Sequence, residues 1–394
     1  MRKSVLCAFG LVVAVLVALG LVVLSSASEV RGIRMYNNAY HFITRQSIYL
    51  LIALVVCVVV ACLDYRIWRD APVITWLFYG AIIILLVSVF FLGRKINGSY
   101  RWISLGPVNV QPSEFAKLAT VIVLAMWLDR AGWKVELKGI GLFGSGILIA
   151  GLAVPVMLEP DFGSTLVIGS VGAVIMVIAG VRVIHLLPIV LLGGGLVVYK
   201  VVTNPNRMAR IAAYLGFDSD TIIAFLSCIG VNISSEAAQN ASYQSDQALV
   251  ALKNSCIWGA GLTQSLQKHK YLPENHTDFI FAIGAEELGV IFSLGVILLF
   301  VIFFALSLHI AKSSTDRFGR LLAYGMAFIV FSQAIFNIGV VCEAFPTKGM
   351  ALPFFSYGGT NLIASFFAVG TILSVGIHSR REKKRERLRK MLVR

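Results

Sequence analysis

The sequence predicts an all-α polytopic membrane protein, and its composition and the length of its apolar runs both support this fold class. Of the 394 residues, 58% are hydrophobic and only 14% are charged, and the mean hydropathy is +0.84. A soluble domain of this length would need far more polar surface to cover its core. The apolar residues also come in runs of about 20, which is the length at which an α-helix spans a bilayer.

Ten apolar runs are candidate transmembrane helices. They lie near residues 5–25, 46–63, 72–92, 115–128, 139–157, 164–180, 183–202, 279–308, 320–341 and 358–378. The first run is too long for the apolar part of a signal peptide, which is about 7–15 residues, so we interpret it as a first span. An even number of spans places both termini on the same side of the membrane.

The basic residues predict that this side is the cytoplasm. The net charge is +14, and many Lys and Arg residues lie in the terminal sequence HSRREKKRERLRK and in the loops DYRIWRD, DRAGWKVELK and KSSTDRFGR. Such residues accumulate on the cytoplasmic side of membrane proteins. We therefore expect one ten-helix membrane domain over residues 1–378 and a basic cytoplasmic tail over 379–394. That tail is expected to contact anionic lipid headgroups rather than nucleic acid.

The loops on the opposite, outer side carry the unusual sequence. The longest runs from about 203 to 277, before the eighth span, and long connections of this kind are usually functional. The six cysteines form no CxxC or His/Cys cluster, so no metal site is expected. Cys228 and Cys256 share the long loop and would pair only if it faces an oxidising space.

Asp278 is the candidate catalytic residue. It lies at the mouth of the eighth span, and the apolar residues 279–281 follow it directly. Partial desolvation there would raise the pKa of its carboxyl towards that of a useful general base. An N-cap role for Asp278 or Thr277 is compatible with this interpretation. Glu286 and Glu287 lie deeper in the same run, and we expect structural or gating roles for them.

Basic residues on the outer side would bind phosphate groups, which suit both Arg and Lys side chains. A lipid-linked diphosphate would use such residues, and nonspecific binding to headgroups is the alternative. They are Arg94, Lys95, Arg101, Lys117, Arg207, Arg210, Lys268, Lys270 and Lys348. The loop sequence FFSYGGT adds Ser356, Tyr357 and the flexible Gly358. No GxxxxGK[ST], GxGxxG or HExxH motif supports nucleotide or zinc chemistry.

Six motifs, in order along the chain, resemble the SEDS family (shape, elongation, division and sporulation) of peptidoglycan polymerases. They are NGSYRWISLGPVNVQPSEFAKLA, EPDFGST, NRMARIAAYL, YQSDQAL, QKHKYLPENHTDFIFAIGAEELG and PTKGMALPFFSYGGTNL. The sequence PTKG is similar to the division-type, FtsW-like branch rather than to the RodA-like branch. The chain departs from the family pattern at KNSCIWGAG, at GGTNL and in a longer stretch near 216–242.

The resemblance implies glycosyl transfer on lipid II during cell division, at the outer face of the inner (cytoplasmic) membrane. Asp278 matches the family's catalytic aspartate. The substrate-binding residues would be Arg101, Lys117, Lys268, Lys270, His276, Thr277, Lys348, Ser356, Tyr357 and Gly358. The supporting residues would be Gln111, Ser113, Glu114, Asp161, Glu286 and Glu287. The implied partner is a single-span class B penicillin-binding protein, a transpeptidase, with other division proteins as neighbours.

The expected chemistry is a direct, inverting displacement. Glycosidases need two carboxylates, but a diphosphate is already a good leaving group, so one base and a cationic cradle suffice. No tightly bound cofactor is expected, although magnesium or manganese would assist by bridging phosphates. Two alternatives remain open, a lipid II flippase and a noncatalytic scaffold for the class B penicillin-binding protein. A flippase would need polar groups at mid-depth or on both faces, whereas these motifs lie on the outer face.

Overall fold

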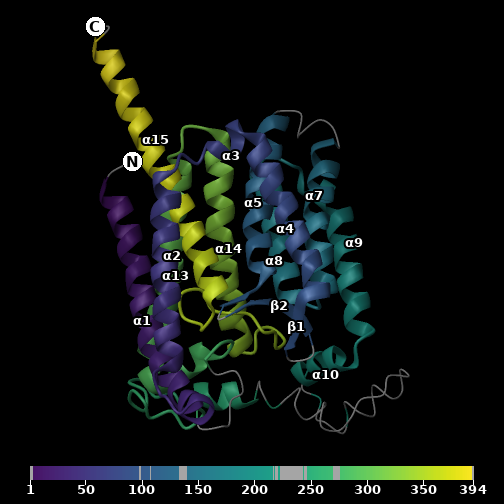
Figure 1. Ribbon diagram of the computed structural model, residues 1–394, viewed down its shortest axis with the longest axis vertical. Helices are drawn as coiled ribbons and strands as arrows, with labels where there is room; N and C mark the ends of the chain where they lie inside the picture. The colour runs from purple at the N-terminus through teal and green to yellow at the C-terminus, as the bar shows by residue number, and fades with distance from the viewer. Residues whose placement is uncertain are drawn as a thin grey trace.

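The computed structural model describes the chain except residues 1–2, 97–98, 107, 133–139, 216, 218–220, 222–242, 244–245, 269–275 and 393–394. Long helices lie side by side in a bundle, and both termini lie at the same end of it (Figure 1). A small sheet and the short helix α10 (Pro205–Tyr214) lie at the opposite end. We call these the terminal end and the loop end. The shared position of the termini agrees with an even number of crossings.

The bundle contains the long helices of the described chain. They are α1 (Lys3–Tyr36), α2 (His41–Cys62), α4 (Pro72–Leu92), α5 (Pro112–Ala131), α7 (Ile140–Leu158), α8 (Phe162–Ile178), α9 (Val183–Val202), α13 (Ile280–Lys312), α14 (Arg317–Val341) and α15 (Gly359–Leu392). Among the described residues, seven helices are long and apolar enough to cross a membrane. The other predicted runs correspond to the shorter apolar helices α7 and α8 and to α5. Because α15 continues past residue 378, the predicted tail extends the last helix.

Helix α5 is the centre of the bundle and packs against α4, α7, α8 and α14. Most of its side chains are buried, including the charged Glu114 and Lys117 near its start. These two side chains form an ion pair with an N–O distance of 2.8 Å. An unpaired charge would strongly destabilise a buried helix, so this pairing is what allows α5 to lie inside the bundle.

A small sheet departs locally from the all-helical prediction. Residues expected to form an outer loop form the antiparallel strands β1 (Gly93–Ile96), β2 (Ser99–Leu105) and β3 (Val108–Val110), in the order β1-β2-β3. The sequence SYRWISL of β2 contains the aromatic and β-branched residues that favour strands. The sheet connects α4 to α5 and brings Arg101 to the turn between α7 and α8.

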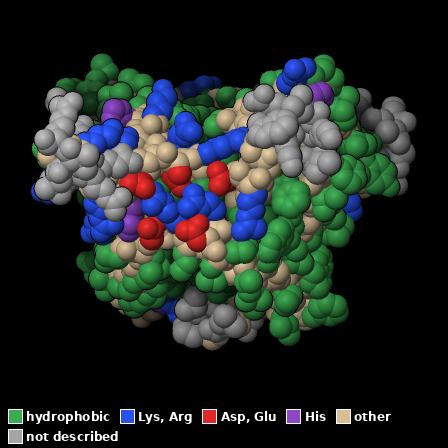
Figure 2. Space-filling view, turned by 90° about the horizontal axis from the view of Figure 1, so that it is seen from above, with side chains coloured by type: hydrophobic (Ala, Val, Ile, Leu, Met, Phe, Trp, Pro, Cys, Tyr) green, Lys and Arg blue, Asp and Glu red, His purple; other side chains and the backbone are tan. Residues whose placement is uncertain are grey.

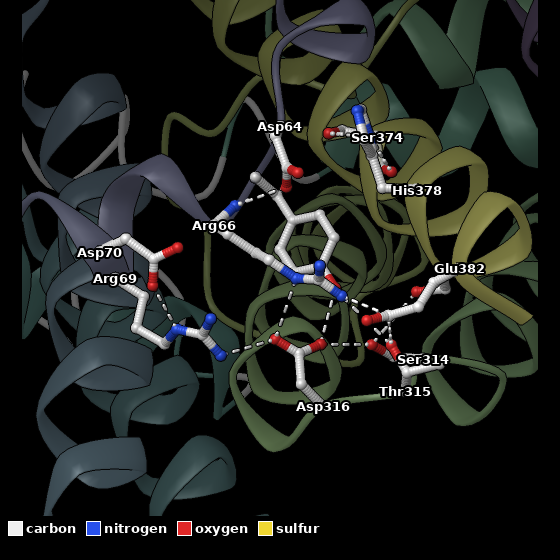
Figure 3. A network of polar contacts seen from close by, with 12 residues as sticks. Asp64, Arg66, Arg69, Asp70, Ser314, Thr315, Asp316, Ser374, His378 and Glu382 are labelled. Carbon is white, nitrogen blue, oxygen red and sulfur yellow. Dashed lines mark hydrogen bonds and ion pairs between the residues drawn. The ribbon is translucent and has the colours of Figure 1, made fainter. Parts of the chain in front are cut away.

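The charged residues of the terminal end form a network that joins three parts of the chain (Figure 3). Asp316, between α13 and α14, accepts a 2.6 Å hydrogen bond from Tyr65 and pairs with Arg69 of the short helix α3 (Ile67–Asp70) at 3.1 Å. Arg66 pairs with Glu382 of α15 at 2.5 Å. Figure 2 shows this face, with acidic side chains gathered among basic ones near its middle.

Candidate active site

A cavity of about 120 Å³ opens at the loop end. Its walls come from β2, from the turn between α7 and α8 with the start of α8, from α10, and from the loop that precedes α15. These segments are far apart in the sequence, and each begins or ends next to a helix of the bundle. The cavity is therefore built by loops on a rigid helical support, which is the usual position of a binding site.

Four cationic side chains line this cavity: Arg101, Arg207, Arg210 and Lys348. Burial lowers the pKa of Lys348. Burial also lowers the pKa of Arg207 and Arg210, and the nearby charge of Arg101 adds to the effect. Burial and mutual repulsion make the charged forms of these side chains less favourable. A bound anion would relieve the repulsion, so the cavity attracts anions strongly.

Two of these arginines are fixed by contacts that leave their charge available. Arg101 donates hydrogen bonds to the backbone carbonyls of Glu159, at 3.4 Å, and Pro160. The guanidinium of Arg207 lies 4.0 Å from the ring centroid of Phe162. Neither contact involves a carboxylate, so both side chains are positioned without being neutralised.

Asp278 lies directly beside the cavity wall, in the turn before α13. Its Oδ2 atom is 2.8 Å from the position that a Cβ of residue 349 would occupy, and Gly349 lines the cavity. The negative charge of its carboxyl group partly opposes the lowering of the pKa of Arg210 by burial and by Arg101, so the two charges lie within electrostatic range. The predicted base is thus brought next to Gly349 and Lys348, which follow it in the sequence only after the whole of α13 and α14.

The turn that carries Asp278 is joined to the loop before α15 by backbone contacts. The side-chain amide of Asn337, on α14, donates to the carbonyls of Asp278 at 2.7 Å and Met350 at 2.6 Å. The Ser356 hydroxyl donates to the carbonyl of Thr277 at 2.5 Å. These bonds fix the backbone on both sides of the Asp278 carboxyl, which is the rigidity that a positioned base requires.

The other predicted residues of this region take part in the same junction. The backbone N–H of Tyr357 donates to the carbonyl of His276 at 2.9 Å, and that of Gly358 donates to Gln46 of α2 at 3.3 Å. The His276 ring is buried, and the ring of Phe42 lies 5.0 Å from it. The structure therefore gives His276, Tyr357 and Gly358 clear packing partners within the protein.

Asp161 lines the cavity and is also the N-cap of α8. Its carboxylate accepts hydrogen bonds from the backbone N–H of Ser164 at 3.2 Å, from Gln111 at 3.1 Å and from Ser113 at 3.0 Å. The predicted supporting residues Gln111, Ser113 and Asp161 thus form one cluster that links the starts of α5 and α8. These donors fix the orientation of the Asp161 carboxylate, and no described ion pair joins it to the four cavity cations.

Two predicted phosphate-binding lysines lie elsewhere. Lys117 is 2% exposed and pairs with Glu114, which also accepts a 3.2 Å hydrogen bond from Asn361. Lys268 is 4% exposed and lies 3.4 Å from Glu287. Neither lysine lines the described cavity. Both lysines are held in buried ion pairs, and their contact with phosphate stays a prediction.

Glu286 and Glu287 lie in a buried polar cluster at the start of α13. Glu286 accepts hydrogen bonds from the Ser265 hydroxyl and, at 3.2 Å, from the backbone N–H of Leu266. Glu287 accepts a 2.6 Å hydrogen bond from Ser26 of α1. These contacts tie α1 and residues 265–268 to α13, and the structural or gating role expected for the two glutamates stays a prediction.

Glu159 is a feature that the sequence did not single out. It is 0% exposed, and neither carboxyl oxygen has a hydrogen-bond partner among the described residues. Burial raises its pKa to about 8, and the neighbouring Asp161 adds to this rise. An unpartnered carboxyl directly behind the cavity wall is therefore protonated near neutral pH.

Some predictions fall outside the described residues or on side chains that are not described. These are Lys270, Cys228, most of the stretch 216–242, and the side chains of Arg94 and Lys95. Cys256 is an exposed free cysteine. Within the described part of the chain, no group of three or more His, Cys, Asp or Glu residues forms a candidate metal site.

The chain is similar to known proteins over most of its length. Residues 7–381 match the FtsW/RodA/SpoVE family of cell cycle proteins. A Trichlorobacter lovleyi protein named probable peptidoglycan glycosyltransferase FtsW is 35% identical, over 93% of this chain and 91% of its own length. A Pseudomonas fluorescens protein of the same name is 36% identical, over 93% of this chain and 86% of its own length.

Solved structures share the whole arrangement. One chain, described under "Structural coordination of polymerization and crosslinking by a peptidoglycan synthase complex", has a TM-score of 0.69 and 26% identity, and the match covers 94% of this chain and 97% of that chain. The rod shape determining protein RodA of Thermus thermophilus has a TM-score of 0.64 and 25% identity, with 94% and 96% coverage.

Proposed function

We infer that this chain, which belongs to the FtsW/RodA/SpoVE family of cell cycle proteins, is a membrane-embedded peptidoglycan glycosyltransferase of the division type that acts on lipid II. The position of Asp278 is the main support for the proposed catalytic site. A carboxyl group lies against the wall of a cavity lined by four cations. That arrangement supplies both a proton acceptor and an anion-binding surface.

Asp278 is the proposed general base. The acceptor sugar's hydroxyl oxygen forms a bond to the anomeric carbon of the donor while the bond from that carbon to the diphosphate oxygen breaks. The hydroxyl proton passes to the Asp278 carboxylate, and the configuration at the carbon inverts. No acid is needed on the leaving side, because the diphosphate departs as a stable anion.

The cavity cations are the proposed diphosphate site. Arg101, Arg207, Arg210 and Lys348 line the cavity, and Asp161 is satisfied by its own hydrogen bonds. Cations positioned before the reaction stabilise the charge that develops on the leaving group, which is often the largest contribution to catalysis. Magnesium or manganese bridging the phosphates would add to the same effect.

We also propose the orientation and the partner. Basic residues at the terminal end support a cytoplasmic position for both termini, so the cavity would face the outside of the inner membrane. A class B penicillin-binding protein is the proposed partner, with other division proteins as neighbours. A structural relative belongs to a synthase complex that coordinates polymerisation and crosslinking, which supports this assignment.

The test of the proposed base is Asp278→Asn. This change keeps the shape of the side chain but removes its ability to accept a proton, so glycan synthesis should fall by roughly 100-fold or more. Purified wild type and variant would each be incubated with labelled lipid II in detergent. The amount of polymerised glycan would then be measured from the ladder of products on a gel. Equal thermal unfolding would show that both are folded. A variant as fast as wild type would overturn the assignment, and an inactive wild type with its partner present would favour a transporter or scaffold.

Gly349→Ala tests whether the carboxyl position matters. The new Cβ would lie 2.8 Å from Oδ2 of Asp278, so the carboxyl must move away. We expect at least a tenfold loss of polymerisation with little loss of stability, because a small displacement of a catalytic group is enough to slow the reaction. Gly169→Ala in α8 is the control, since nothing lies within 4 Å of the added atom there. Equal rates for the two variants would contradict the proposed geometry.

A further inference from the structure

A second cavity, of about 320 Å³, lies at the terminal end, opposite the candidate active site. It is formed by the last residue of α8, the last residue of α13 and the first two turns of α14. One water molecule needs roughly 10–15 Å³ of such space, so the cavity is far larger than a single water site. The cavity is therefore large enough for a phosphate group with part of the molecule attached to it.

The lining of this cavity is basic and contains no acidic residue. It consists of Ile178, Lys312, Arg317, Arg320, Leu321 and Tyr324. Arg317 is held in place by a 2.6 Å hydrogen bond to the carbonyl of Ala179, at the end of α8. Asp129 of α5 is within electrostatic range of Arg317. Lys312 and Arg320 form no ion pair with any described residue, so the cavity keeps a positive charge.

Two neighbouring arginines differ from the cavity residues Lys312 and Arg320 because each has a carboxylate partner. On the same face, Arg66 pairs with Glu382 at 2.5 Å and Arg69 pairs with Asp316 at 3.1 Å (Figure 3). The general excess of basic residues on one side of a membrane explains the sign of the charge. It does not explain why cations from two helices gather around one cavity, whereas Arg66 and Arg69 each have a carboxylate partner.

The surroundings of the cavity favour a lipid over a free anion. Val177 and Ile178 at the end of α8 are 44% and 41% exposed, and they belong to an apolar helix of the bundle. Their side chains would face the acyl chains of the surrounding bilayer. A ligand with a phosphate in the cavity and hydrocarbon along α8 would therefore satisfy both surfaces.

We propose that this cavity binds the phosphate headgroup of an anionic phospholipid from the adjacent leaflet. Lys312 and Arg320 supply the uncompensated charge, Arg317 supplies a fixed donor, and the Tyr324 hydroxyl donates to a phosphate oxygen. Basic pockets between membrane helices bind headgroups in this way. The site is separate from the cavity beside Asp278, so it does not depend on the proposed catalytic function.

The test uses the purified full-length chain in neutral detergent, titrated with phosphatidylglycerol and followed by native mass spectrometry. The Lys312→Gln/Arg320→Gln double variant should bind roughly 25-fold more weakly, because each lost cation weakens attraction to an anionic headgroup by roughly fivefold. Lys384→Gln is the matched control. It removes an exposed Lys from α15 on the same end, outside the cavity lining, and should bind like wild type.

Separate arms identify the source of the phosphate. Inorganic phosphate should displace phosphatidylglycerol only at far higher concentration, because it lacks the chains that contact α8. Equal potency of inorganic phosphate would overturn the lipid assignment in favour of a free anion site. Displacement by a hexaglutamate peptide at equimolar concentration would overturn it in favour of an acidic protein partner. Unchanged lipid binding by the folded double variant would overturn the site itself.

Discussion

Glu159 is a fully buried carboxyl group that has no hydrogen-bond partner among the described residues. In the unfolded chain its carboxyl has a pKa of 4.5, and burial beside Asp161 raises this to about 8 in the folded protein. Between these values the folded state keeps a proton that the unfolded state has lost. Stability therefore falls as the pH rises from about 4.5 to about 8, and it stays lower at higher pH.

Glu159→Gln should remove this part of the pH dependence, because the amide does not ionise. We expect the variant to unfold at a higher temperature than wild type at pH 9 and to differ little from it at pH 5. Thermal unfolding in detergent between these pH values would measure the effect. Glu343→Gln, at a partly exposed position of the same end, serves as the control. Parallel pH profiles for wild type and Glu159→Gln would show that the carboxyl does not titrate in this range.

At the scale of one element, α13 combines a membrane helix with a sharp local bend. Gly289 has φ of 83° within the helix, a conformation that favours glycine. Residues 256–261 pack against this bend, and the backbone N–H groups of Ala260 and Gly261 donate to the carbonyls of Glu286 and Glu287, both at 2.9 Å. The bend thus frees helix carbonyls for an adjacent segment, which helps to hold the two glutamates in their cluster.

Gly289→Ala should disrupt that junction. A Cβ there would lie 2.4 Å from the carbonyl oxygen of Ile257, in a backbone conformation that strains any L side chain. We expect a destabilisation of about 2–4 kcal/mol, measured as a lower midpoint of thermal unfolding. Gly295→Ala in the same helix has nothing within 4 Å of the added atom and should be neutral or slightly stabilising. If both variants unfold at the same temperature, the bend is not under this constraint.

The sequence predicted elements better than the partners of individual residues. Each predicted apolar run corresponds to a helix, because hydropathy over 20 residues is a local property. The β1–β3 sheet was missed because strands of three to seven residues inside a loop give little periodicity.

Long-range contacts were beyond sequence reasoning. A single sequence does not show that Glu114 pairs with Lys117 or that Glu287 pairs with Lys268. Asp278 was located from its context, but Asn337 and Gly349, which contact it, were not assigned to the site. An amide inside the apolar sequence AIFNIGVV was the one available signal for Asn337.

The two ends of the molecule differ in whether charged side chains find partners within the protein. At the loop end, four cavity cations surround a space that an anion would fill. At the terminal end, Asp316 satisfies the hydroxyls of Tyr65 and Ser314, at 2.6 and 3.0 Å, and pairs with Arg69. A network that is satisfied within the protein stabilises the fold, whereas uncompensated charge is a property of sites that bind ligands.

Asp316→Asn tests this division at the scale of the whole molecule. The variant keeps the shape of the side chain but loses the charge that joins the α13–α14 connection to Arg66 and Arg69. We expect a destabilisation of about 2 kcal/mol by thermal unfolding, because hydrogen bonds to a charged group are lost in a partly buried network. Asp70→Asn, which removes an exposed partner of Arg69, should change stability by less than about 1 kcal/mol.

The same variant should keep its rate of glycan synthesis at temperatures where it remains folded. The network lies at the terminal end, whereas the candidate active-site cavity is lined by α10 at the loop end (Figure 1). A loss of rate without a loss of stability would mean that the two ends are coupled through the helices between them. A loss of stability without a loss of rate would show that the network at the terminal end stabilises the fold and is not needed for catalysis. In that case Lys312 and Arg320, which line the cavity at this end and have no described ion pair, would be available for a ligand.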